Sequence, residues 1–301
     1  MTSLDSFPSV SPDISDRRIE ATPSGLEIEF QNKPKRRYRL RWSEFAWVQP
    51  MNSSDPANSQ WVEVPSVTTV LELVKDAGPL IWWGQRVGIE GMLDLIAREL
   101  LPADASPDDV IDLFKQHKLT VNHVRDLAGD RGTNVHTVLE NWVEQDKRLP
   151  DPAFYPERER GHITGLAAFL NDITPFADQI LSEFMVASMR HRYAGRPDLR
   201  VVLPGPVTLS SRCYPKRGAV YATFPAGTYL FDLKTSKRVY RNQLIQLKAY
   251  EEAARESGYG PSDHQAVVRC SPEGEYEIVL SDQSFEDFLA VRRLFTQFTG
   301  L

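Results

Sequence analysis

The sequence predicts an α/β protein with a mixed β-sheet core flanked by helices, preceded by an N-terminal β-hairpin region and a helical subdomain. Three observations support this class. Apolar and polar residues alternate near the N-terminus, helical periodicity extends from about residue 65 to 170, and strand and helix patterns mix from about residue 179 onward. A chain of 301 residues has room for one large domain or two small ones.

The N-terminal part is expected to form a flexible arm and then a β region. Residues 1–20 are rich in Ser, Pro and Asp, a composition that predicts the arm. The β region is assigned to residues 21–64. Within it, LEIEF (26–30) and YRLRW (38–42) alternate apolar and polar residues as half-buried strands do. A basic turn is expected over residues 32–37 and a polar loop over residues 51–60.

A helical subdomain is expected over residues 65–175. Ser66 or Thr68 is a suitable N-cap for a first helix that ends near Val74, and a long apolar helix is predicted over residues 80–101. Further helix starts are predicted at Ser106, where Pro107 occupies the first turn, at Thr120, and at Gly132-Thr133.

The core is expected over residues 176–301. Predicted strands cover residues 182–189, 193–203, 219–224, 228–233, 264–269 and 276–280. Predicted helices cover residues 243–255 and 284–298.

Composition and charge narrow the function classes. Apolar residues make up 41% and charged residues 25%, which is typical of a soluble globular protein. The formal net charge of -6 excludes nucleic-acid binding by bulk positive charge, so any such contact needs a local basic surface. No apolar run approaches the ~20 residues of a membrane span, and the N-terminus lacks a signal-peptide pattern. We therefore expect a cytoplasmic protein without membrane contact.

Acidic and basic side chains gather around one predicted strand end. Asp232 and Lys234 are two residues apart and therefore project from the same face of a strand. Asp198 adds a second carboxylate, and two close aspartates repel each other unless a hard divalent cation lies between them. His136 offers a nitrogen ligand from a helix. In isolation, an Asp-x-Lys pair is more often structural than catalytic.

Taken in order, these segments resemble the RecB-like branch of the PD-(D/E)XK nucleases. The matching motifs cover residues 64–254, and the opening segment is similar to that of phage exonucleases; CRISPR-associated adaptation nucleases are relatives. The ordered set comprises Gly132 with His136, then Glu183, Gly195 with Asp198, Asp232-Leu233-Lys234-Thr235, and Gln246 with Tyr250.

The resemblance implies a restriction-endonuclease-like sheet and hydrolysis of DNA phosphodiesters with Mg²⁺ or Mn²⁺. It assigns His136, Asp198, Asp232 and the carbonyl of Leu233 as metal ligands. It assigns Lys234 to orient or activate the attacking water and to stabilise negative charge.

The remaining motif residues receive supporting roles from the same resemblance. Gln246 and Tyr250, four residues apart on one helix face, complete the site. Glu183 is expected to bind a second metal or to orient Lys234. Basic residues near the motifs are predicted to contact DNA, namely Arg196, Lys237, Arg238 and Arg241. Arg39 and Arg41 are predicted to do so as well, because strand alternation places them on one face.

The chain departs from the family pattern in two ways. Some relatives hold an iron–sulfur cluster through four cysteines, whereas this sequence has two, so no cluster is predicted. Asp198 and Asp232 are also far apart for adjacent strands, which predicts an inserted hairpin or loop over residues 204–227.

Several functions remain open from the sequence. The favoured one is an exonuclease acting in phage DNA replication, recombination or repair, in the cytoplasm of a bacterial host. A recombinase, an annealing protein or a helicase is a possible partner. The alternatives are a structure-specific endonuclease of the same fold and a non-catalytic protein that binds DNA or a partner.

Overall fold

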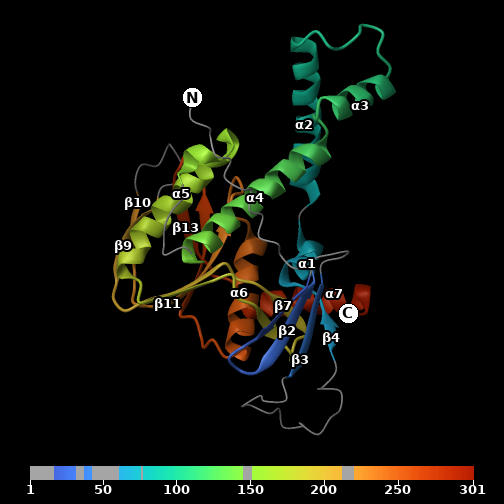
Figure 1. The fold of residues 1–301 in the computed structure, drawn as a ribbon. Helices are drawn as coiled ribbons and strands as arrows, with labels where there is room; N and C mark the ends of the chain where they lie inside the picture. The colour runs from blue at the N-terminus through green and yellow to red at the C-terminus, as the bar shows by residue number, and fades with distance from the viewer. Residues whose placement is uncertain (1–16, 32–36, 43–60, 76, 145–150, 212–219) are drawn as a thin grey trace, which may run out of the picture.

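The computed structural model describes residues 17–31, 37–42, 61–75, 77–144, 151–211 and 220–301 (Figure 1). Its strands are β1 (Arg17–Ala21), β2 (Leu26–Gln31), β3 (Arg37–Trp42), β4 (Val62–Val64), β5 (Gln179–Ser182), β6 (Val186–Ser188), β7 (Tyr193–Gly195), β8 (Leu199–Leu203), β9 (Val207–Ser211), β10 (Val220–Phe224), β11 (Gly227–Lys234), β12 (His264–Cys270) and β13 (Tyr276–Leu280). Its helices are α1 (Val67–Leu71), α2 (Ala77–Ala97), α3 (Pro107–Gln116), α4 (Val121–Glu144), α5 (Glu157–Ile173), α6 (Arg241–Glu256) and α7 (Phe285–Thr299), with 3₁₀ turns η2 (Glu72–Val74), η3 (Pro152–Phe154) and η4 (Thr174–Phe176).

The central sheet has the strand order β13-β12-β11-β8-β5. The β11–β12 pair is parallel and the other pairs are antiparallel, so the predicted mixed sheet is confirmed. The parallel pair requires a crossover, which α6 supplies. Because β8 runs opposite to both β5 and β11, the ends of β5 and β11 meet the start of β8 at one edge of the sheet.

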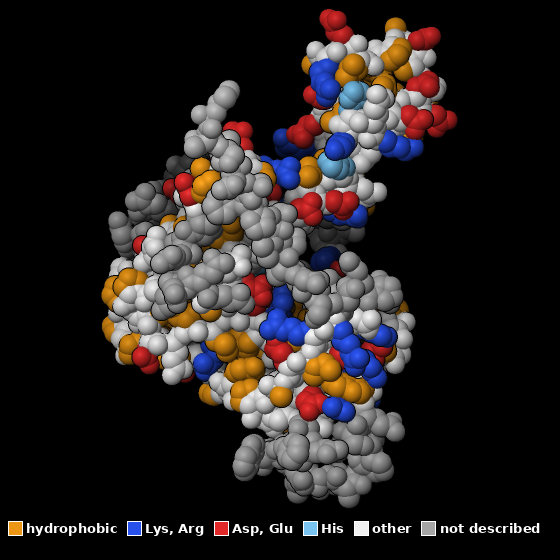
Figure 2. Space-filling model, viewed as in Figure 1, with side chains coloured by type: hydrophobic (Ala, Val, Ile, Leu, Met, Phe, Trp, Pro, Cys, Tyr) orange, Lys and Arg blue, Asp and Glu red, His pale blue; other side chains and the backbone are white. Residues whose placement is uncertain are grey.

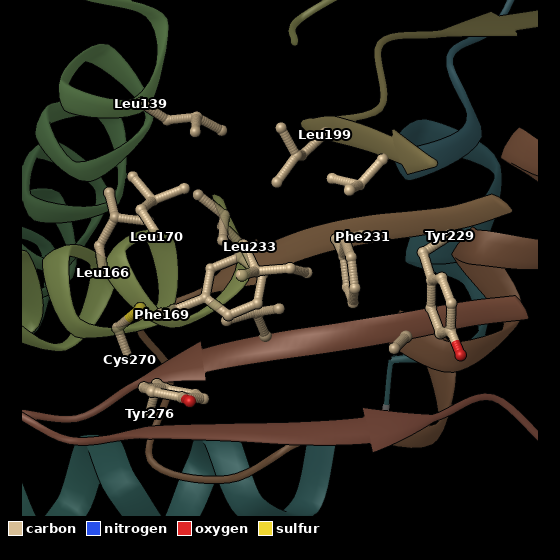
Figure 3. Packing of buried hydrophobic residues seen from close by; sticks show 14 of the residues in the cluster. Leu139, Leu166, Phe169, Leu170, Leu199, Tyr229, Phe231, Leu233, Cys270 and Tyr276 are labelled. Carbon is tan, nitrogen blue, oxygen red and sulfur yellow. The ribbon is translucent and has the colours of Figure 1, made fainter. Parts of the chain in front are cut away.

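One face of this sheet packs against α4 and α5. Along β11, Tyr229, Phe231 and Leu233 alternate toward this face, as the two-residue period of a strand requires. Figure 3 shows Phe231 and Leu233 packing against Phe169 and Leu170 of α5. This cluster forms the larger apolar core between helices and sheet.

The opposite face packs against α1, α6 and α7. Leu230 of β11 joins this second cluster together with Leu247 and Tyr250 of α6. Asp232 and Lys234 alternate toward the same side as Leu230, so they project toward α6. The sheet therefore separates an apolar core from a face that carries the charged residues at its edge.

Two glycines of α5 let this helix approach the turn between β12 and β13. A Cβ atom at Gly161 would collide with the carbonyl of Pro272, and one at Gly165 would crowd the carbonyl of Glu275 at 2.6 Å. Backbone approach this close is possible only without side chains.

The N-terminal region forms an antiparallel sheet in the order β1-β2-β3-β4. Strands β2 and β3 confirm the two predicted strands, and their apolar residues pack with those of β6 and β7 in a third cluster. The prediction of a flexible N-terminal arm over residues 1–20 is wrong for residues 17–20, because β1 begins at Arg17 and pairs with β2 along its whole length. Residues 1–16, residues 32–36 of the predicted basic turn and the loop at 51–60 lie outside the described residues, while Arg37, the last residue of that predicted turn, already belongs to β3.

Helices α2 and α3 and the start of α4 project from the body as an arm (Figure 1). Ser66 caps α1 through Thr69 N–H, which settles the choice between Ser66 and Thr68. A capping box of Ser106 and Asp109 begins α3 as predicted. None of the described helices is long and apolar enough to cross a membrane.

The prediction of a helix start at Gly132-Thr133 is wrong, because α4 runs unbroken through both residues. The Thr133 hydroxyl donates back to the Gly129 carbonyl at 3.2 Å, which is a helix-interior bond rather than a cap. The predicted strands 182–189 and 193–203 are each interrupted. Glu183 adopts a left-handed φ of 49° after β5, and Pro197 separates β7 from β8.

The long connection between Asp198 and Asp232 contains the predicted insertion. Strands β9 and β10 form an antiparallel hairpin, while β8 and β11 pair directly. The tip, residues 212–219, lies outside the described residues.

Candidate functional site

A cavity of about 370 Å³ opens where β5, β8 and β11 meet at the sheet edge. Acidic and basic side chains lie next to each other near the middle of the face shown in Figure 2. The cavity is lined by Tyr38, Ser66, Thr68, Gly129, Gly132, Thr133, His136, Glu183, Gly195, Arg196, Asp198, Asp232, Lys234, Gln246 and Tyr250. The cavity therefore brings together His136, Glu183, Asp198, Asp232, Lys234, Gln246 and Tyr250, whereas Thr235 lines a neighbouring cavity.

Two carboxylates and an imidazole form the first group. Nδ1 of His136 lies 3.1 Å from Oδ1 of Asp198 and 3.4 Å from Oε1 of Glu183. Arg196 Nε contacts the other oxygen of Glu183 at 2.7 Å. Both carboxyl groups are buried, so each depends on these cations for its charge.

Local backbone geometry places this group. Left-handed φ is uncommon for a residue with a Cβ, and at Glu183 it turns the chain out of β5 toward the cavity. The backbone N–H of Glu183 donates to the Asp198 carbonyl at 3.0 Å. The Asp198 carboxylate in turn accepts from the N–H of Leu233 at 2.5 Å. These bonds tie the end of β5 and the start of β8 to the end of β11.

Asp232 and Lys234 form the second group. Their side chains make an ion pair, as expected for two residues on one face of β11. Gln246 of α6 donates to Oδ1 of Asp232 at 3.1 Å and to the Tyr250 hydroxyl at 2.8 Å. Both oxygens of Asp232 are thus oriented by neighbouring side chains.

Gly195 sets the position of Tyr250. A Cβ atom at Gly195 would overlap the Tyr250 ring, so the ring fits only because residue 195 has no side chain. The glycine of the Gly-x-x-Asp motif is therefore explained by packing.

Burial and neighbouring charges shift the pKa values of the three side chains in the first group in different directions. Burial opposes the charge of His136, but attraction to Asp198 and Glu183 outweighs it and raises the pKa of His136 to about 10. Burial also opposes ionisation of Asp198, yet His136 and Lys234 hold its pKa below the usual value. Burial dominates at Glu183 and raises its pKa.

The second group contains a protonated lysine and a buried aspartate with a raised pKa. Burial, only partly opposed by Lys234 and reinforced by Asp198, raises the pKa of Asp232 to about 6. Burial works against the ammonium of Lys234, but Asp232 and Asp198 raise its pKa overall. Lys234 is therefore a cation in this cavity, not a neutral base.

The side chains that fit a divalent cation are His136, Glu183 and Asp198. Each offers one ligand atom, and these atoms lie within 4.8 Å of one another. Nitrogen and carboxylate oxygens are ligands that Mn²⁺ accepts, and the carboxylates suit Mg²⁺. Asp232, also a predicted ligand, lies outside this group, and Lys234 and Gln246 contact its oxygens.

Other features bear on the predicted ligands. The Leu233 side chain is buried in the core, and its N–H holds Asp198. Cys270 is buried in the apolar core, whereas Cys213 lies outside the described residues.

The predicted DNA-contacting residues separate into two sets. Arg196 lines the cavity, and Lys237 lines a neighbouring one. Arg238 lies over the Tyr240 ring, and Arg241 donates to Gln283 at 2.8 Å.

Arg39 and Arg41 line neither cavity. They pair across the N-terminal sheet with Glu29 and Glu27, at 3.0 and 2.6 Å, and both lie over Trp61. The structure accounts for these two arginines by cross-strand pairing.

Some lining residues were not anticipated as part of the site. Tyr38 reaches the cavity from β3, and Ser66 and Thr68 reach it from the start of α1. A parallel bridge between Ser66 and Ala194 holds that start beside β7. The cap position of Ser66 was readable from the sequence, but its contact with a strand more than 120 residues later was not.

Comparison of the chain with models of protein families and with curated proteins gives no match.

Proposed function

We propose that the protein is a divalent-metal-dependent nuclease that hydrolyses DNA phosphodiester bonds, with a restriction-endonuclease-like core. The observation that carries the proposal is one cavity in which His136, Glu183 and Asp198 face a buried Asp232–Lys234 pair. These residues come from α4 and from three strand ends. Buried carboxylates and a lysine cost stability, so their convergence favours a chemical role over a structural one.

Lys234 acts as a fixed positive charge. Its ammonium lies in the cavity beside Asp232 and stays protonated. From this position it donates a hydrogen bond to the attacking water or to a phosphate oxygen. It also stabilises the negative charge that develops on the phosphate oxygens in the transition state. A protonated lysine does not remove a proton from water, so Lys234 orients and stabilises.

Asp232 holds Lys234 in that position. Gln246 and Tyr250 are positioning residues, because Gln246 bonds both Asp232 and the Tyr250 hydroxyl. Arg196 positions Glu183 in the same way. The cavity thus has its charged groups oriented before a substrate enters.

The donor set of His136, Glu183 and Asp198 fits Mg²⁺ or Mn²⁺. When bound, such a cation supplies the positive charge that phosphodiester hydrolysis needs in its transition state. In its absence, protonated His136 balances the two carboxylates.

Among nucleases, we favour an exonuclease, on the strength of the resemblance to phage exonucleases. The test uses end-labelled linear DNA and circular single-stranded DNA, with Mg²⁺, Mn²⁺ or EDTA. We expect metal-dependent loss of the linear DNA alone, absent in Lys234→Ala and retained in Lys115→Ala, a control on the distant α3. Loss of the circle would indicate an endonuclease. Cleavage by Lys234→Ala at the wild-type rate would contradict the proposed mechanism.

A further inference from the structure

A second cavity, of about 440 Å³, lies beside the first and is lined mainly by basic and hydroxyl side chains. Four cationic residues face it, against one acidic residue, Glu273. The lining residues are Arg131, Arg158, His162, Thr235, Ser236, Lys237, Arg269, Ser271, Pro272 and Glu273. We call it the basic cavity.

The two cavities share their wall. We call the cavity that holds His136, Asp198 and Asp232 the acidic cavity. On β11 and the turn after it, Lys234 lines the acidic cavity while Thr235 and Lys237 line the basic one. On α4, Gly132 lines the acidic cavity and Arg131 the basic one. Gly132 and Thr235 face each other, since a Cβ atom at Gly132 would lie 3.9 Å from the Thr235 hydroxyl oxygen. The basic cavity thus adjoins the proposed active site.

Two of the four cations are already engaged. Arg269 pairs with Glu277 at 3.0 Å, and Arg158 lies 3.5 Å from Glu159. Arg131 is attracted to the buried Glu159, but its own Nε is buried and has no hydrogen-bond acceptor among the described residues. Burial also lowers the pKa of Arg131, and an anion in the cavity beside the guanidinium would offset that penalty by favouring the charged form.

Lys237 supplies the second available charge. Its side chain is exposed at the cavity and takes part in none of the hydrogen bonds or ion pairs found among the described residues. Burial lowers the pKa of His162 and outweighs the hydrogen bond between its Nδ1 and the Cys270 carbonyl oxygen at 2.7 Å, so His162 contributes less positive charge than the arginines and Lys237. Arg131 and Lys237 therefore define the anion-binding character of the cavity.

We propose that the basic cavity is a phosphate-binding subsite for the nucleic-acid strand whose scissile phosphodiester lies in the acidic cavity. The inference rests on the proposed function and specifies how the strand is held. Lys237 follows Lys234 by three positions, so their Cα atoms are at most about 11 Å apart. With the reach of the two side chains added, the bound phosphate belongs to a nucleotide within a few positions of the scissile bond.

The test measures binding without metal, so it does not depend on cleavage. Fluorescent single strands of about 12 nucleotides carry a 5′-phosphate, a 3′-phosphate, hydroxyl ends only, or one neutral methylphosphonate at successive positions. Wild-type protein, Arg131→Gln, Lys237→Gln and the control Lys115→Gln are titrated in EDTA over a range of salt concentrations. Lys237→Gln changes an exposed side chain, so it stays informative even if Arg131→Gln fails to fold.

We expect each cavity variant to bind about tenfold more weakly. The negative slope of log affinity against log salt should become shallower by about 0.7 per lost phosphate contact. The control should keep the affinity and the slope of the wild type. If the phosphate is terminal, one phosphorylated end tightens binding to wild type but not to the variants. If it is internal, the ends have no effect, and one methylphosphonate position reproduces the variants' loss.

Wild-type affinity and salt slope in both variants would overturn the subsite, and so would a loss no larger than that of Lys115→Gln. Cleavage by the wild type together with unchanged binding by the variants would remove the subsite and leave the proposed function. The predicted binding pattern without any metal-dependent cleavage would remove the proposed function and leave the subsite.

Discussion

Replacing Asp232 by asparagine is expected to stabilise the metal-free protein while abolishing cleavage. Asp232 is fully buried, close to Asp198, and its pKa is raised to about 6. The charged form of this side chain is therefore disfavoured in the folded protein. A neutral residue of the same shape removes that unfavourable charge but also removes the group that holds Lys234 in place.

The size of the effect follows from the pKa. Because the folded protein holds this proton more tightly than the unfolded chain, the stability from Asp232 is complete below about pH 4 and is lost as the pH rises through about 6. The difference between about 6 and the usual value of 3.8 corresponds to about 3 kcal/mol at neutral pH. Asp232→Asn should gain up to that amount.

The assay is urea unfolding in EDTA at pH 7.5 and pH 5, followed by tryptophan fluorescence. We expect the gain of the variant at pH 5 to be about half of that at pH 7.5, since wild-type Asp232 is then largely protonated in the folded state. Asp94→Asn, an exposed change on α2, should alter stability by less than about 0.5 kcal/mol.

Lys234→Ala should change the free energy of unfolding in the opposite direction. The pKa of Lys234 is raised in the folded protein, so its charge stabilises the fold and its removal should destabilise it. If Asp232→Asn is less stable than wild type, or if its gain in stability does not depend on pH, the charge of Asp232 is not unfavourable in the folded protein and the reasoning is refuted.

Three further predictions follow from the site and its support. Gly195→Ala should displace the Tyr250 ring and lower cleavage at least about 100-fold, which kinetics of purified protein would measure; an unchanged rate would show that the ring position is unimportant. Binding of Mn²⁺ at pH 8 should release about one proton, because His136 with a pKa of about 10 is protonated before it binds, and affinity should rise with pH up to about 10. Calorimetry in buffers of different ionisation enthalpy measures this release, and a value of zero would exclude His136 as a ligand. Gly161→Ala should lower the midpoint of thermal unfolding by several degrees through collision with the Pro272 carbonyl, and an unchanged midpoint would contradict that packing.

Short-range periodicity made the arrangement of the site residues on β11 and α6 predictable. The two-residue period of a strand places Asp232 and Lys234 on one face, and the structure shows them paired. The four-residue spacing of Gln246 and Tyr250 places them on one helix face, where they share a hydrogen bond. Both relations depend only on neighbours in the sequence.

Long-range pairing was not predictable to the same degree. Glu183 reaches His136 because of a left-handed turn after β5, a conformation that its residue type does not suggest. Arg39 and Arg41 were correctly placed on one strand face. Their partners were not foreseen, because the β2–β3 register that sets Glu29 and Glu27 opposite them is a tertiary property.

Helix continuity also depended on context. Gly132-Thr133 reads as a helix start, yet α4 continues because Val135, Val138 and Leu139 pack against the sheet. Burial of that face outweighs the weak local preference of glycine.

Single-turnover cleavage of linear DNA across a Mg²⁺ titration, with wild type, Asp232→Asn and Asp94→Asn in parallel, tests the proposed metal-dependent nuclease centre most directly. We expect wild type and Asp94→Asn to share rates that saturate with Mg²⁺ and vanish in EDTA. We expect Asp232→Asn to be at least about 100-fold slower while remaining folded. Cleavage in EDTA, or an Asp232→Asn rate within tenfold of wild type, would contradict a metal-dependent centre at this sheet edge.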